Sequence, residues 1–296
     1  MSVESSLREV TRLIEQSEQG AVLDQLAEQL QGIMRTAVEQ GGPAARRLKN
    51  WLHGTWLGHP LHPALTDVPI GAWTVAFLLD VVGAEEQADA AMTIGALAAV
   101  PTALAGAADW SDMDPPARRV GLVHALLNTF GLTCIIASLF ARRNDNRALG
   151  VGLSTAGLSV ASFSAWLGGS LVYREGIGVS HNAFEPGVDE FQPVIGEDSL
   201  QPSKLTYAEL NTEGGRVPLV LYKSGASIYA LSNVCSHLGG PLAEGKVVDG
   251  NCVECPWHAS QFRLSDGTVR QGPATVPQPL FETRVRGGQI EVRRVR

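Results

Sequence analysis

The spacing of hydrophobic residues differs between parts of the chain. In residues 1–50 it is the spacing of amphipathic helices. Apolar side chains recur there at helical spacing between charged residues, which predicts two amphipathic helices. Their apolar positions are Leu7, Val10, Leu13 and Ile14 in the first helix and Leu23, Leu26, Leu30, Ile33 and Met34 in the second. Acidic residues interrupt the region, so it lacks the continuous apolar core of a signal peptide. We interpret residues 1–50 as a helical segment that packs on a neighbouring domain or lies at a membrane interface.

Four apolar stretches follow, and we expect each to form a membrane-spanning helix. They cover residues 68–79, 90–108, 120–141 and 148–173, and the last three carry no charged residue. As helices, these three are long enough to cross the roughly 30 Å of a bilayer's hydrocarbon core. The first stretch is shorter, and we expect Pro69 to lie near its start. Buried helices of a soluble bundle are the alternative, but none of the last three stretches shows a polar face.

The charges that flank these stretches predict an orientation. Four crossings place both ends of the region on one side of the membrane. The short segments on that side carry Arg46, Arg47, Lys49, Arg118, Arg119 and Arg174. The opposite side carries Arg142, Arg143 and Arg147, together with the acidic Glu85, Glu86 and Asp89. The excess of basic residues therefore predicts that the side with both ends is cytoplasmic.

Beyond a polar linker at residues 181–193, the pattern alternates between apolar and polar positions, as in β-strands. Three pairs of alternating runs flank the dipeptides Ser224-Gly225, Asp249-Gly250 and Gly287-Gly288, each of which predicts a two-residue hairpin turn. The chain is thus predicted to be multi-domain. We expect an all-α part, made of the helical segment 1–50 and a four-helix transmembrane domain at 51–180, and an all-β domain at 194–296.

Composition supports this division and excludes some functions. Charged residues are only 18% of the 296, which is low for a wholly soluble protein. The net charge of −7 argues against nucleic acid as a partner. Of the four cysteines, two stand beside histidines, so a disulfide framework is not indicated. Cys134 and Cys252 have no such neighbour, and we interpret them as ordinary helix and strand residues.

Two Cys–His pairs stand in the predicted β domain, and we expect both to lie at hairpin tips. Cys235 precedes His237, and Cys255 precedes His258, with about a hairpin's length of chain between the pairs. Thiolates and imidazoles together are ligands for soft or borderline transition metals. Zinc fingers group Cys with Cys and His with His, whereas each of these segments holds one of each. The pattern therefore favours a two-iron cluster over a Cys2His2 zinc site.

The block CSHLGGPLAEG…CPWHASQF resembles the cluster-binding segment of a Rieske [2Fe-2S] domain, of the ferredoxin type found with ring-hydroxylating dioxygenases. The resemblance covers roughly residues 192–296. It implies that Cys235 and Cys255 bind the inner iron and that His237 and His258 bind the outer iron, on the solvent side. It also implies that the cluster is shielded by Leu238, Gly240, Pro241, Pro256, Trp257 and Pro273.

Two differences from the Rieske domains of respiratory complexes indicate which type of Rieske domain this sequence resembles. Rieske domains of respiratory complexes carry an additional, disulfide-bonded cysteine in each loop, where this chain has Gly240 and Trp257. The sequence thus resembles the lower-potential ferredoxin type, and we expect a midpoint toward the bottom of the range of about −150 to +300 mV. No iron-binding oxygenase domain follows the β domain, so we expect an electron carrier without a catalytic residue of its own. The sequence does not specify its redox donor, its acceptor or its oligomeric state.

The helical region contains histidines that could bind a second cofactor. Residues 59–179 resemble a four-helix bacterial membrane domain family of unassigned function, which implies a multi-pass protein of the bacterial inner membrane. Five further histidines, His53, His59, His62, His124 and His181, are expected near the cytoplasmic side. In one interpretation His62 and His124 are axial ligands of a haem b. In another, His59, His62 and His124 hold a non-haem metal with Asp67 or line a quinone pocket. In the third they cap helices at the interface.

These observations lead to one main hypothesis and two alternatives. The main hypothesis is a membrane-anchored Rieske protein that transfers electrons near the cytoplasmic face of the membrane. One alternative is a redox sensor or assembly protein whose cluster reports the redox state. The other is a membrane oxidoreductase with a haem b or quinone site in its helical domain.

Overall fold

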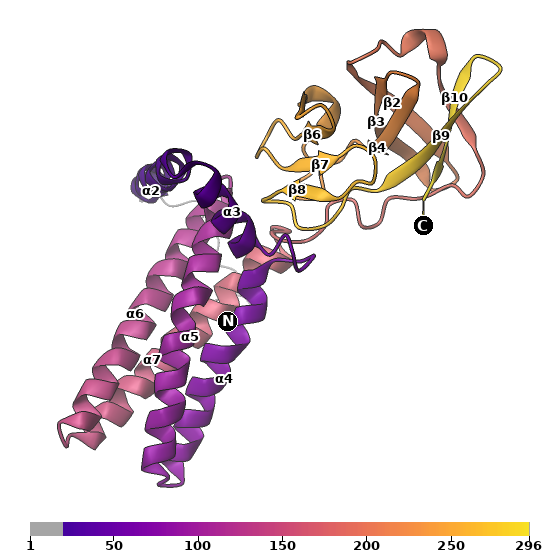
Figure 1. Cartoon of the computed structure of the whole chain (residues 1–296). Coiled ribbons are helices and arrows are strands. Elements are labelled where there is room, and N and C mark those ends of the chain that lie inside the picture. Colours follow the sequence, from indigo (N-terminus) through magenta and orange to yellow (C-terminus); the bar gives the residue numbers. More distant parts are fainter. Residues whose placement is uncertain (1–19, 296) are drawn as a thin grey trace. The chain divides into compact units, whose positions relative to one another are not determined.

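The computed structural model describes residues 20–295 (Figure 1). The chain divides into two compact units, Met1–Leu52 with Pro60–Glu175 and His53–His59 with Gly176–Arg296. The first predicted amphipathic helix, which includes Leu7, lies outside the described residues. The second forms α2, Gly20–Gln40, and is followed by α3, Gly42–His53.

Helix α2 packs on the helices that follow it in the chain. Ala27 is fully buried in a cluster with Trp110, and the Gln31 side-chain amide donates a hydrogen bond to the Trp110 carbonyl at 2.9 Å. Near this contact, the carboxylate of Asp24 accepts hydrogen bonds from Arg119, which lower the pKa of Asp24. Of the two interpretations of the amphipathic pattern, packing on a neighbouring domain is the one that the structure shows for α2.

Four long helices run side by side after α3 (Figure 1). They are α4, Leu61–Val81; α5, Glu85–Trp110; α6, Ala117–Arg143; and α7, Arg147–Tyr173. Each is long and apolar enough to cross a membrane, which confirms the four predicted spans. The expectation that Pro69 lies near the start of the first span was wrong, because α4 begins at Leu61 and Pro69 lies inside it.

The interior position of Pro69 leaves one carbonyl of α4 without its usual N–H donor, and a hydroxyl of α5 lies near that carbonyl. Because proline has no N–H, Pro69 cannot donate to the Leu65 carbonyl one turn earlier. The Thr102 hydroxyl of α5 donates to the Ala98 carbonyl of its own helix at 2.8 Å and lies 3.3 Å from the Leu65 carbonyl, so its one proton can be shared between the two. A side-chain hydroxyl in this role is a common solution in membrane helices, where water is not available.

The distribution of side chains over the four helices is that of a membrane bundle. Large apolar side chains are exposed on the outer faces, among them Val75, Leu78, Ile94, Leu97, Leu104, Phe130, Phe140 and Leu149. The interior instead holds small residues, among them Ala76, Gly95, Ala99, Ser138, Gly157, Ala161 and Ser164. Small interior residues allow close helix packing in lipid, and the outer faces suit hydrocarbon. We conclude that the helical unit is a multi-pass membrane domain.

A buried ion-pair cluster joins the two helical hairpins at the end where each hairpin turns. Arg142 of α6 contacts Asp80 of α4 at 2.5 Å and Asp89 of α5 at 2.8 Å, and Arg147 of α7 contacts Asp80 at 2.7 Å. The side chains of Asp80 and Arg142 are only 4% and 1% exposed. Charges that the sequence places on one side of the membrane therefore neutralise one another inside the protein.

The C-terminal unit contains two antiparallel sheets. The larger has the order β1-β10-β9-β4-β3-β2 and consists of β1, Gln192–Gly196; β2, Leu205–Thr212; β3, Gly215–Ser224; β4, Ser227–Ser232; β9, Leu280–Arg286; and β10, Gln289–Arg294. The smaller has the order β5-β6-β7-β8 and consists of β5, Lys246–Val248; β6, Cys252–Glu254; β7, Gln261–Arg263; and β8, Val269–Gln271. The three predicted hairpins are present as β3–β4, β5–β6 and β9–β10. The predicted two-residue turn is confirmed for Gly287-Gly288, where Arg286 pairs with Gln289. The prediction was wrong in detail for the other two, because Ser224 pairs with Ser227 around Gly225-Ala226, and Val248 pairs with Cys252 around a three-residue loop.

The two Cys–His segments occupy different kinds of connection. The second lies between β6 and β7, which pair with each other, so it forms a hairpin tip as expected. The first lies between β4 and β5, which belong to different sheets. The prediction of a hairpin tip was therefore wrong for the first segment. Both cysteines join the buried cluster of apolar residues that includes Phe262 and Leu264.

Candidate metal centre

The two Cys–His segments fold into loops with the same backbone closure. In each loop the cysteine carbonyl accepts a hydrogen bond from a residue in the left-handed conformation, Gly239 in the first loop and Ala259 in the second, at 2.8 and 3.1 Å. The cysteine N–H donates to the carbonyl of the residue that follows the left-handed one, which is Gly240 in the first loop at 2.9 Å and Ser260 in the second at 2.8 Å. This closure turns the chain tightly enough for each loop to present one thiol and one imidazole.

The loops bring the four predicted ligands together as two like pairs. Cys235 and Cys255 are 1% and 3% exposed, and the thiol of Cys235 contacts that of Cys255. The rings of His237 and His258 are half-buried, with centroids 5.0 Å apart and planes at 83°. The thiols thus lie inside and the imidazoles lie nearer to solvent, which is the arrangement that the resemblance implies.

Backbone amides face both sulfurs, whereas the hydrogen bond between the two thiols shifts their pKa values in opposite directions. A hydrogen bond from the Cys235 thiol, opposed by burial and aided by the backbone amides of Trp257 and His258, lowers the pKa of Cys255 to about 6. The same thiol–thiol contact and burial raise the pKa of Cys235, although the amides of His237 and Leu238 also face its sulfur. Backbone N–H groups that point at a sulfur stabilise a thiolate ligand once a metal is bound.

The donor set fits a two-iron cluster better than a single ion. Among residues 20–295 there is no group of three or more His, Cys, Asp and Glu side chains that could hold one metal ion. A thiol pair and an imidazole pair instead match a cluster in which one iron has two Cys and the other has two His. The residues present therefore fit the predicted [2Fe-2S] cluster.

Glycine is required where the first loop passes the second. A Cβ atom on Gly240 would lie 2.7 Å from the Cys255 sulfur and 3.1 Å from the Trp257 ring. No side chain fits in this space, so the glycine permits the close approach of the loops. Of the residues predicted to shield the cluster, Gly240 and Pro273 are buried, Leu238 and Pro241 are half-buried, and Pro256 and Trp257 are exposed.

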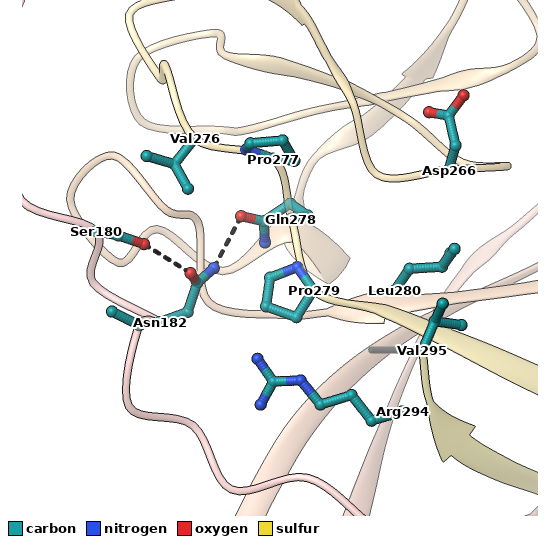
Figure 2. A pocket seen from close by; sticks show the side chains of 11 residues that line it. Ser180, Asn182, Asp266, Val276, Pro277, Gln278, Pro279, Leu280, Arg294 and Val295 are labelled. Atoms are coloured by element: carbon teal, nitrogen blue, oxygen red, sulfur yellow. Dashed lines mark hydrogen bonds between the residues drawn. The ribbon is translucent and has the colours of Figure 1, made fainter. Parts of the chain in front are cut away.

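Two buried amide side chains that sequence reasoning missed hold the first loop in place. Gln278 accepts a hydrogen bond from the Ser236 N–H at 2.8 Å and donates to the carbonyls of Ser232 and Val234. Asn182 donates to Gln278 at 2.9 Å, as Figure 2 shows along a groove of about 390 Å³. Gln and Asn carry no distinctive chemistry, and Gln278 is 42 residues from Ser236 and 96 from Asn182. No sequence signal pointed to them.

The second loop has a comparable support. Ser260 is fully buried, and its hydroxyl accepts a hydrogen bond from the Ala274 N–H at 3.0 Å. This bond holds the segment after Pro273 against the second loop. The predicted linker also belongs here, since the His181 N–H donates to the Ser236 carbonyl at 3.1 Å. His181 is therefore part of the β unit.

Of the histidines in the helical region, the structure brings two together. The rings of His62 on α4 and His124 on α6 have centroids 6.2 Å apart. His59 falls in the other compact unit. Within residues 20–295, His59, His62, His124 and Asp67 do not assemble into a group of three or more possible ligands. The interpretation of a shared non-haem metal finds no support in this arrangement.

Comparisons with known proteins agree with both units. Residues 190–283 match the family described as Rieske [2Fe-2S] domain, and residues 58–181 match the family described as predicted membrane protein (DUF2231). Ferredoxin CarAc of Metapseudomonas resinovorans is 37% identical over 99 residues, which are 33% of this chain and 89% of the relative. The anthranilate 1,2-dioxygenase ferredoxin subunit of Burkholderia cepacia is 36% identical over 26% of this chain and 71% of the relative.

A solved structure titled as the complex of reduced oxygenase and oxidized ferredoxin in carbazole 1,9a-dioxygenase also contains a similar chain. That chain is 32% identical, with a TM-score of 0.31, over 35% of this chain and 92% of its own length.

Proposed function

Because this chain belongs to the Rieske [2Fe-2S] ferredoxin family through its C-terminal domain, we propose that it is an electron carrier anchored in the membrane by its helical domain. Four apolar helices precede the ferredoxin domain in the same chain. The proposed cluster ligands are Cys235, Cys255, His237 and His258. When bound, the cluster accepts and releases one electron at a time.

The observation that carries this proposal is the pairing of buried thiols with half-buried imidazoles. Cys235 and Cys255 are enclosed by the apolar cluster around Phe262, which keeps water from the thiolates. His237 and His258 extend toward solvent and offer the path by which an electron reaches a partner protein. The relatives are named as ferredoxins of dioxygenases, so an oxygenase is the first acceptor to test.

We further propose that the ferredoxin domain lies on the cytoplasmic side of a bacterial inner membrane. The helical domain crosses the membrane an even number of times, and Arg118, Arg119 and Lys49 belong to the side that also bears the C-terminal domain. Basic residues are retained on the cytoplasmic side during insertion.

A combined fractionation and spectroscopic experiment tests this function. We expect the full chain to remain in the membrane fraction after a high-salt wash and to show the EPR signal of a reduced Rieske cluster. In right-side-out vesicles, a protease should leave the ferredoxin domain intact, whereas inverted vesicles should lose it. A protein that washes off the membrane, or one without the EPR signal, would refute the proposal. The signal without transfer to any added oxygenase would favour a redox sensor.

The absence of two bridging cysteines predicts a low redox potential for the cluster. Gly240 and Trp257 lie side by side where the resemblance places a disulfide in respiratory Rieske domains. We expect a redox titration followed by EPR to give a midpoint toward the bottom of the range of about −150 to +300 mV. A midpoint well above zero would contradict the assignment to the ferredoxin type.

A further inference from the structure

The membrane domain is built from two copies of one helical hairpin. Each residue of the hairpin α4–α5 has a counterpart 62 positions later in α6–α7, as Asp80 and Arg142 illustrate. The buried positions of α5 and α7 coincide at this spacing: Ala88 and Gly150, Met92 and Ser154, Gly95 and Gly157, Ala99 and Ala161, Thr102 and Ser164, Ala105 and Leu167, Ala108 and Ser170. The turns agree as well, because Gly83 and its counterpart Asp145 both have a left-handed backbone, with φ of 77° and 57°.

The two hairpins also pack against each other with approximate two-fold symmetry. Exchanging the hairpins replaces α4 with α6 and α5 with α7, and the pairs α4–α7 and α5–α6 are both in contact. Since both hairpins begin at the same end of the bundle, the two-fold axis runs along the helices, as in membrane proteins built from parallel repeats. Counterpart residues that face the axis should therefore meet there. Asp80 and Arg142 do so at one end, 2.5 Å apart.

At the other end, the counterparts that meet are two histidines in equivalent environments. His62 Nδ1 lies 2.9 Å from the carbonyl of Thr102, and His124 Nδ1 lies 2.7 Å from the carbonyl of Ser164. Thr102 and Ser164 are themselves counterparts. A carbonyl only accepts, so each Nδ1 carries the proton and each Nε2 is left as the basic nitrogen. A hydrogen bond from the second nitrogen to a carbonyl is the support that metal-ligating histidines usually have.

A pair of counterpart glycines makes room for the two rings. A Cβ atom on Gly106 would lie 2.8 Å from the His62 ring, and one on Gly168 would lie 3.1 Å from the His124 ring. Gly106 and Gly168 each stand one helical turn beyond the residue that accepts the histidine hydrogen bond. The repeat thus preserves the histidine, its carbonyl partner and the space for its ring, although most of its other side chains differ.

We propose that His62 and His124 are the two axial ligands of a b-type haem bound on this axis, a redox site that goes beyond the proposed function of the ferredoxin domain. Two imidazoles that bind one iron at about 2 Å from opposite sides have ring centroids roughly 6 Å apart. The observed separation is 6.2 Å. A bare metal ion would need further ligands, and no third His, Cys, Asp or Glu completes a site among the described residues. A haem iron needs only two, because the porphyrin supplies four nitrogens.

One polar contact must open when the haem binds. The Asn128 amide lies 3.1 Å from His124 Nε2 and donates to it. The corresponding residue on α4 is Thr66, whose hydroxyl donates to the Pro63 carbonyl at 2.7 Å. Asn128 therefore occupies the coordination position at His124 and must rotate away from this nitrogen when the haem binds.

The test is an absorption spectrum of the full chain, produced in haem-replete cells and purified in detergent. We expect haem b with the spectrum of a six-coordinate, bis-imidazole iron, and we expect His62→Ala and His124→Ala each to reduce bound haem at least tenfold. His59→Ala is the matched control and should bind haem as the unaltered chain does. Protein without a Soret band, haem retained in both variants, or a stoichiometric metal without porphyrin would overturn the proposal.

A conservative variant guards against a simple folding defect. His124→Met keeps an axial ligand and should retain haem with an altered spectrum and a higher midpoint, because thioether ligation raises the potential of haem iron. A spectrum and midpoint unchanged by this substitution would show that His124 is not a ligand. The EPR signal of the [2Fe-2S] cluster, which uses other residues, should persist in every variant. Failure of the haem proposal therefore remains distinguishable from failure of the proposed function.

Discussion

Replacing Cys255 with serine is expected to abolish the [2Fe-2S] cluster. The thiolate of Cys255 is the better prepared of the two, because hydrogen bonds lower its pKa to about 6, and a serine hydroxyl is not deprotonated at neutral pH. Cys235 alone cannot hold the inner iron. We expect iron and acid-labile sulfide to fall from a two-iron content to background, and the EPR signal to vanish, in both Cys255→Ser and Cys235→Ser.

The chain offers a matched control for this experiment. Cys252 is also buried in the β unit, on strand β6 next to the second loop, but it is not a proposed ligand. Cys252→Ser should keep iron, sulfide and the EPR signal. A protein that loses its cluster equally in Cys252→Ser and Cys255→Ser would point to general unfolding. A cluster that survives in Cys255→Ser would show that the ligands are assigned wrongly.

Local sequence patterns encode the membrane spans and the β-hairpins of this chain. The four spans were predictable because uninterrupted apolar runs have few other solutions at such lengths. Three β-hairpins were predictable because their turns contain glycine at positions that need a left-handed backbone, such as Gly225 with φ of 58°. The start of α4 was not predictable in this way. The polar residues His62, Thr66 and Asp67 end the apolar run although the helix continues through them.

The candidate metal centre could be proposed from the sequence for the residues with distinctive chemistry, but not for those that support them. Cys and His at short spacing are rare outside metal sites, so the four proposed ligands were evident from the sequence alone. Gln278 and Asn182 carry ordinary amides, and only the folded chain brings them to the first loop. Support by distant polar side chains follows from the tertiary structure, which a single sequence does not reveal.

The duplicated hairpin was missed for a related reason. Most counterpart residues differ in chemistry, as Trp73 differs from Ile135 and Asp80 differs from Arg142. What the repeat preserves is burial, small size and the two histidines. Burial is visible only in the structure, where Trp73 and Ile135 both lie in the interior of the bundle. The chemical meaning of His62 and His124 depends on recognising them as counterparts.

The second large effect is expected from Arg142→Ala, which should strongly destabilise the membrane domain. Arg142 is nearly inaccessible and holds the carboxylates of Asp80 and Asp89. Removing one member of a buried ion pair leaves the other charge uncompensated, which costs about 3–5 kcal/mol. Arg147 also contacts Asp80 at 2.7 Å and retains part of the pairing, so we expect the lower end of this range. Reversible unfolding in mixed detergent micelles measures the change.

Arg143 provides the matched control because it is the next residue of α6, carries the same charge and is exposed. Arg143→Ala should change the free energy of unfolding by less than about 0.5 kcal/mol. Asp80→Ala combined with Arg142→Ala should be less destabilised than the sum of the single variants, because the double variant buries no unpaired carboxylate at position 80. Equal losses in Arg142→Ala and Arg143→Ala would show that the cost reflects surface charge and orientation in the membrane. Additive losses in the double variant would show that Asp80 and Arg142 stabilise the bundle independently and do not act as a pair across its axis.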